Sequence, residues 1–138
     1  VPIEYSKKNL EELGRLGVRI VGGTPALWGI DRSLIVKYGG TSTQEIINET
    51  LRLISPGFRV CIEIALMAAD NGAIPTNEEA IVTAGTERGL DTAVVIKPSV
   101  SVKMFDLHDG MEIREIICKP RTMLSPKGRF IGRYRLLE

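Results

Sequence analysis

The residues with the clearest capacity for chemistry lie in the loop Gly85–Asp91, which reads GTERGLD. It joins two apolar stretches, 79–84 and 92–97, that each have the composition of a strand. Its glycines expose backbone amides, Thr86 offers a hydroxyl and Arg88 offers a guanidinium. These donors suit the oxygens of a phosphate group. The loop is therefore interpreted as an anion site, or alternatively as an ordinary connection whose glycines only permit the turn.

A second glycine-rich stretch, 22–40, has a composition suited to a ligand loop. Gly23 and Thr24 begin it, and Trp28, the only tryptophan, could stack on a flat ring or anchor the core. Neither a Walker loop nor a dinucleotide fingerprint is present, because the glycines lack the required spacing and no Gly-Lys-Ser/Thr follows.

Two further titratable residues are candidates for chemistry. Glu63 lies in an otherwise apolar segment, where it could act as a general acid or base, or serve a structural role by pairing with an arginine or lysine or by capping a loop amide. His108, the sole histidine, stands between Asp106 and Asp109, and without another His or Cys nearby it is expected to be a surface residue rather than a metal ligand. No metal site is predicted.

The elements that must position these residues follow from periodicity. Ser42 and Glu45 form a capping box that begins an amphipathic helix ending at 55–57. The segment Phe58–Asn71 has almost no polar face and is expected to be a buried helix, with Gly72 as its left-handed cap. A helix is also expected over 6–16, strands over 18–21, 79–84, 92–97 and 112–118, and a brief strand or helical turn at 34–36.

Composition narrows the function classes. A chain of 138 residues with 43% hydrophobic and 25% charged residues is one globular domain's worth of sequence. The apolar helix is too short and too charged to span a membrane, and the net charge of +1 does not favour nucleic acid. Cys61 and Cys118 are expected to be reduced core residues, and the expected location is the cytoplasm.

Charge is concentrated at the end of the chain. From Lys119 onward six basic residues stand against one acidic residue. We therefore divide the sequence into one α/β domain, 1–120, and a basic extension, 121–138. Such an extension can contact phosphate surfaces, or it can be a solvated or oligomer-contact segment.

Several blocks resemble one known family. They are GGTPALWGIDRS at 22–33, KYGG at 37–40, ETLR at 49–52, EIALMAADNGAIP at 63–75, GTERGLDTAVVI at 85–96, and the closing FDL and EIICKP. In this order they resemble an archaeal family of small α/β proteins related to the C-terminal domain of pyruvate kinase. The resemblance extends from about Gly23 to Pro120.

The resemblance implies a three-layer α/β fold, with a mainly parallel, twisted sheet flanked by helices. It implies no kinase activity, because the catalytic barrel of pyruvate kinase has no counterpart here. In pyruvate kinases the loop matching Gly85–Asp91 helps to hold a sugar phosphate, and members of the archaeal family are associated with flavin mononucleotide (FMN). The expected ligand-binding residues are Gly23, Thr24, Trp28, Gly85, Thr86, Arg88, Gly89, Asp91 and Thr92.

The chain departs from that family at its beginning. The family normally opens with a further strand–helix–strand region, whose Ser/Thr-Gly loop would supply the other half of a phosphate cradle. Without those strands the sheet would have an open edge, which promotes association. We therefore expect a phosphorylated small-molecule ligand together with a homo-oligomer or a partner chain. A structural or regulatory subunit is the alternative, and a flavin-dependent oxidoreductase follows as a third hypothesis.

Overall fold

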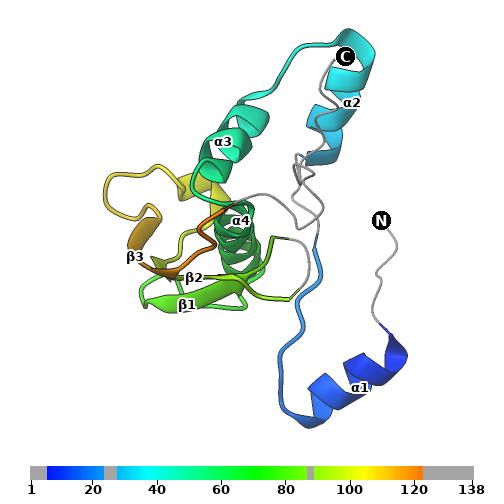
Figure 1. Cartoon of the computed structure of the whole chain (residues 1–138), viewed down its shortest axis with the longest axis vertical. Coiled ribbons are helices and arrows are strands. Elements are labelled where there is room, and N and C mark those ends of the chain that lie inside the picture. The colour runs from blue at the N-terminus through cyan, green and yellow to red at the C-terminus, as the bar shows by residue number, and fades with distance from the viewer. Residues whose placement is uncertain (1–5, 24–27, 87–88, 123–138) are drawn as a thin grey trace.

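A computed structural model describes residues 6–23, 28–86 and 89–122, with only the backbone at 28–32. Its α/β fold has a small sheet with helix α4 lying across one face (Figure 1). The helices are α1 (Lys7–Arg15), α2 (Trp28–Tyr38), α3 (Thr43–Arg52), α4 (Pro56–Asp70) and the short 3-10 helix η1 (Ser101–Lys103). The strands are β1 (Ala80–Ala84), β2 (Thr92–Lys97) and β3 (Glu112–Cys118).

The sheet has the order β1-β2-β3, and both pairings are antiparallel. In the first pairing Ala84 lies opposite Thr92 and Ala80 opposite Ile96. The prediction of a mainly parallel sheet is therefore wrong for the part of the chain that is described. A parallel pair needs a crossover of a dozen or more residues, whereas only the short loop 85–91 joins β1 to β2.

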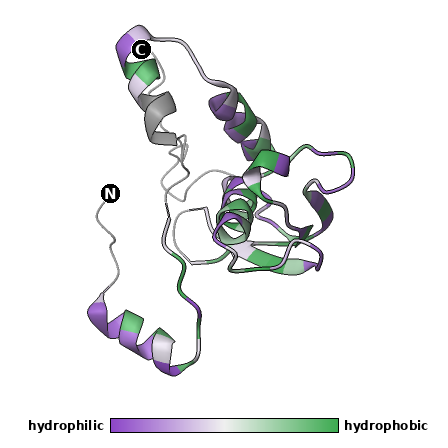
Figure 2. Cartoon of the chain, turned by 180° about the vertical axis from the view of Figure 1, so that it is seen from behind, coloured by the Kyte–Doolittle hydropathy of each residue, from purple (hydrophilic) through white to green (hydrophobic). Residues whose placement is uncertain are grey.

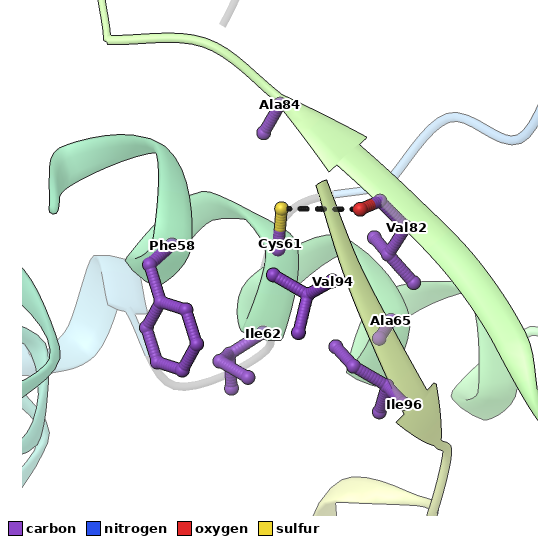
Figure 3. Packing of buried hydrophobic residues seen from close by; sticks show 8 residues of the cluster. All are labelled: Phe58, Cys61, Ile62, Ala65, Val82, Ala84, Val94 and Ile96. Atoms are coloured by element: carbon purple, nitrogen blue, oxygen red, sulfur yellow. Dashed lines mark hydrogen bonds between the residues drawn. The ribbon is translucent and has the colours of Figure 1, made fainter. Parts of the chain in front are cut away.

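Helix α4 covers one face of this sheet. Along β2 the side chains alternate between buried and half-buried, and those of Val94 and Ile96 are fully buried. On the opposite face Ile81 is 70% exposed, so the described elements form two layers rather than the expected three. The buried apolar residues, drawn in Figure 3, are Phe58, Cys61, Ile62, Ala65, Val82, Ala84, Val94 and Ile96. Burying a side chain such as Phe58 contributes about 1.5–3 kcal/mol.

The helix ends carry the caps predicted at Ser42 and Gly72, and a further cap, Ser55, that was not predicted. Ser42 Oγ accepts the Glu45 amide at 3.1 Å, and Ser55 Oγ accepts the Phe58 amide at 3.0 Å. Helix α4 begins at Pro56, two residues before the predicted start, because proline is favoured in the first turn. Gly72 has a φ of 61°, which confirms the left-handed cap.

The predicted strand at 18–21 is wrong, since these residues belong to no helix or strand. The guanidinium of Arg19 instead donates to the carbonyl of Ala73, at 3.3 Å, just beyond α4. The stretch 34–36, left open between strand and helix, lies within α2. Figures 1 and 2 show α1 and α2 standing away from the body formed by α4 and the sheet.

Candidate functional site

The loop Gly85–Asp91 closes the β1–β2 hairpin, and its glycines are needed where they stand. The Cα of Gly85 packs so closely on the carbonyl of Gly89 that an added methyl group would overlap the carbonyl oxygen. Gly89 has a φ of 71°, which a residue with a side chain rarely adopts. The amide of Asp91 donates to the Ala84 carbonyl at 3.0 Å and completes the turn. The backbone alone therefore accounts for both glycines.

The carboxylate of Asp91 accepts hydrogen bonds from Thr86 and Thr92. Its Oδ2 accepts the backbone amide of Thr86 at 2.8 Å, and its Oδ1 accepts the hydroxyl of Thr92 at 2.7 Å. Burial opposes ionisation of Asp91, but the nearby side chain of Thr86, the Thr92 hydroxyl and the Thr86 amide together outweigh it and hold the pKa of Asp91 below its ordinary value. The loop thus already stabilises one anionic group, supplied by the chain itself.

The same loop packs against the first turn of α4. A methyl group added at Gly57 would overlap Thr92 Oγ1 and would lie 2.7 Å from the Oδ1 of Asp91. Ser55, the cap of α4, has its hydroxyl 3.4 Å from that of Thr92. The positive end of the helix dipole therefore faces the Asp91 carboxylate and adds to its stabilisation.

The hydroxyl of Thr86 differs from that of Thr92 in its hydrogen bonding. The Oγ1 of Thr86 is buried and makes no well-formed hydrogen bond within the described ranges, although the Thr86 side chain lies near enough to the Asp91 carboxylate to lower its pKa. A buried hydroxyl without a well-formed hydrogen bond is costly, so this group could serve a further acceptor. It lies on the residue whose amide already binds a carboxylate.

The predicted ligand-binding residues fall into separate places. Gly85, Thr86, Gly89, Asp91 and Thr92 share the loop at the N-terminal end of α4.

Gly23 lies elsewhere, because a methyl group added there would be 3.5 Å from Met67 and from Asn71. Met67 is ten residues beyond Gly57 on α4, about 15 Å along the helix axis. Thr24, Arg88 and the side chain of Trp28 lie outside the described residues. The structure therefore does not bring Gly23 to the hairpin loop.

The other titratable candidates have ordinary partners. Glu63 forms an ion pair with Arg59 at 2.7 Å, one of the two roles anticipated for it. His108 is exposed, and its backbone amide donates to the Asp106 carboxylate at 2.9 Å. Over the residues described, no group of three or more His, Cys, Asp or Glu side chains could hold a metal ion.

The two cysteines differ in burial. Cys61 is a buried thiol in the core and donates to the Val82 carbonyl at 3.5 Å, as Figure 3 shows. Burial, and then the nearby Asp91 carboxylate, raise the pKa of Cys61 to about 11. The prediction that Cys118 is a core residue is wrong, because it is exposed at the end of β3. Both thiols are free, as predicted.

A pocket of about 480 Å³ lies between α3, α4 and the η1 region, and no sequence pattern predicts it. It is mostly apolar, and it also contains the Arg59–Glu63 pair and Asp70. Its lining residues are Thr43, Gln44, Ile47, Asn48, Leu51, Arg59, Ile62, Glu63, Leu66, Met67, Asp70, Ser101, Met104 and Phe105.

A second hollow of about 450 Å³ lies beside the outer edge of β1. Arg19 and Val21 form one wall, and Ile64 and Ala68 of α4 together with Ile81 of β1 form others. None of the residues of the hairpin loop lines either hollow.

No family model matches this chain. Within the ranges that the structure describes, none of the helices has the length and apolar character needed to cross a membrane.

Proposed function

We propose that this chain binds a phosphorylated small molecule at the loop Gly85–Thr92, with FMN as the leading candidate and without kinase activity. The observation that carries the proposal is the buried hydroxyl of Thr86, which makes no well-formed hydrogen bond to a described residue, next to an amide that already binds a carboxylate. A phosphate oxygen would satisfy this hydroxyl, and the helix dipole of α4 favours negative charge at this end. Arg88, two residues beyond Thr86 in the sequence, would supply the charged donor.

The proposal also draws on the resemblance to the archaeal relatives of the pyruvate kinase C-terminal domain. The block 85–96 that carries much of that resemblance includes the whole hairpin loop. Asp91 opposes phosphate binding electrostatically, because its carboxylate repels a phosphate placed beside it. Ligand phosphate and Asp91 therefore compete for the same donors.

Titration with FMN and with riboflavin separates recognition of the phosphate from recognition of the ring. FMN is expected to bind more tightly than riboflavin. Arg88→Ala should lower the FMN affinity by about tenfold and leave riboflavin unchanged, since an arginine–phosphate pair contributes about 1.5 kcal/mol or more. Arg15→Ala, which removes an exposed arginine from the last turn of α1, is the matched control.

Asp91→Asn should change the FMN affinity in the opposite direction from Arg88→Ala. Removing the like charge should tighten FMN binding by roughly fivefold, about 1 kcal/mol in a solvent-screened loop. An absorption spectrum of the freshly purified protein shows whether flavin is already bound. Equal affinities for FMN and riboflavin, unaffected by either variant, would rule out phosphate recognition at this loop.

Assembly with a second copy is the alternative, and the edge of β1 favours it. Among the described strands β1 pairs only with β2, so its other edge carries unpaired backbone groups. Ile81 is largely exposed there, and the hollow of about 450 Å³ adjoins it. The segment 18–21 has the residue pattern of a strand but pairs with no described strand. It could therefore pair with β1 of a second copy.

Mass measurement by light scattering over a concentration series tests this alternative. Ile81→Lys should shift a dimer toward monomer, because it places a charge on the edge strand. Val102→Lys, at a residue exposed on η1, should leave the mass unchanged. A monomer at every concentration would exclude assembly with itself.

A further inference from the structure

The pocket between α3, α4 and η1 has a defined frame. The backbone amide of Ser101 donates to Oδ1 of Asp70 at 2.7 Å and ties η1 to the last residue of α4. The amide of Met111 donates to the carbonyl of Met104 at 3.1 Å and closes the loop behind η1. Figure 1 shows this yellow segment beside α3 and α4. The walls are therefore held by backbone hydrogen bonds as well as by apolar packing.

The body of the pocket is apolar and its mouth is aromatic. Aliphatic and thioether side chains form the walls, and Phe105, 75% exposed, stands where the pocket meets solvent. The apolar lining residues are Ile47, Leu51, Ile62, Leu66, Met67, Met104 and Phe105. Small-molecule pockets of about 300–1,000 Å³ are typically lined in this way, with a few polar groups that orient the ligand.

The charges in the pocket do not cancel. Arg59 and Glu63 pair at 2.7 Å and neutralise each other, which leaves the carboxylate of Asp70. Its Oδ1 accepts the Ser101 amide, and Oδ2 accepts no hydrogen bond from the described residues. Asp70 also lies at the C-terminal end of α4, where the helix dipole is negative and favours a cation.

From this arrangement we propose that the pocket binds a singly charged organic cation with an apolar body, the cationic group at Asp70 and the body between Leu66, Met104 and Phe105. An ammonium donates to the free oxygen of Asp70, and a cation near an aromatic face gains further attraction. The site shares no residue with the hairpin loop, so it is independent of phosphate binding.

Three probes of the same shape test the assignment: 4-phenylbutylamine, 4-phenylbutanol and 4-phenylbutanoate. They differ only in the charge of the end group. Binding is followed on the full chain by NMR of ¹³C-methyl methionine. Met104 lines this pocket alone and is the diagnostic signal, Met67 lines both this pocket and the second hollow, and Met111 packs against the core and serves as an internal reference.

We expect the amine to shift the Met67 and Met104 signals and to bind about threefold or more tightly than the alcohol, as for a partly exposed ion pair. Asp70→Asn should abolish that preference while keeping the oxygen that accepts from Ser101. Glu115→Gln, on an exposed residue of β3, should leave the preference intact. An unchanged Met111 signal shows that each variant is folded.

Two results would overturn the proposal. If the carboxylate probe binds as tightly as the amine, the charge assignment is wrong. If no probe shifts Met67 or Met104 at millimolar concentration, this pocket is not a small-molecule site.

Discussion

Replacing Gly57 by alanine tests how the hairpin loop is held on α4. The added methyl group would overlap Thr92 Oγ1 and would lie 2.7 Å from Oδ1 of Asp91 and 2.9 Å from Cβ of Thr92. Relief requires either rotation of the Thr92 hydroxyl, which breaks its bond to Asp91, or a shift of the whole loop. In an exposed helix the same substitution is favourable by up to about 1 kcal/mol.

The magnitude follows from these opposing effects. Overpacking of a buried site costs about 1–3 kcal/mol, and loss of a hydrogen bond to a charged acceptor costs about 1.5–3 kcal/mol. Only one of the two relief routes need be followed. After the helix preference for alanine is subtracted, Gly57→Ala should lower the free energy of unfolding by about 1–2 kcal/mol. For a domain of this size the Tm should fall by roughly 4–12 °C.

Urea and thermal unfolding measure this change, and Gly14→Ala provides the matched control. Gly14 lies in α1, and a methyl group added there meets nothing within 4 Å. Exchange of the Thr86 amide proton, which is hydrogen-bonded to Asp91, should also be faster in Gly57→Ala. If Gly57→Ala is as stable as Gly14→Ala and the Thr86 amide is equally protected, the loop does not depend on this contact.

Three further predictions concern the same region. Gly85→Ala should destabilise the chain more than Gly57→Ala, because its methyl group meets the backbone of Gly89 rather than a movable side chain, and urea unfolding compares the two. A thiol reagent such as DTNB at pH 8 should modify exposed Cys118 quickly and reach Cys61 only on unfolding, since burial raises the pKa of Cys61 to about 11; two fast thiols would contradict this. Because the folded pKa of Asp91 is lowered, its contribution to stability is present above the unfolded pKa and is lost as the pH falls through the folded value. Unfolding measured below about pH 5 should therefore depend less on pH in Asp91→Asn, and an identical slope would count against this role.

The elements that depend on local pattern could be predicted from the sequence. The strands 92–97 and 112–118 have the predicted bounds, since alternation and flanking loop residues define them. Ser42 caps α3 as its spacing requires, because a cap needs only an amide three residues away.

Features that depend on distant partners could not be predicted. The segment 18–21 has the composition of a strand but no neighbouring strand to pair with among the described residues, and a strand cannot form without one. The antiparallel order of β1 and β2 was missed for a different reason: the loop 85–91 is too short for a parallel crossover, but the mainly parallel sheet implied by the resemblance was followed instead. The pocket between α3, α4 and η1 could not be predicted, because three segments that are separate in the sequence form it.

The part of the candidate site that sequence identified is the hairpin loop. Its donor groups were recognised, but the role of Asp91 was not, because sequence does not show which acceptor a backbone amide meets. Cys118 was placed in the core because its strand is apolar, yet nothing described covers that end of β3. Exposure at the margin of a sheet depends on its neighbours and not on the strand itself.

Among the described strands, β1 forms one edge of the sheet and β3 the other, and this geometry constrains how copies could form larger assemblies. If β1 pairs with β1 of another copy, a two-fold axis relates the copies and the assembly closes as a dimer. If β1 pairs instead with β3, each addition leaves a new free edge and the result is an open filament. The charged residues Glu112, Arg114 and Glu115 on β3 disfavour the second route, as charges on an edge strand generally do. The charges on β3 thus favour a closed dimer over an open filament.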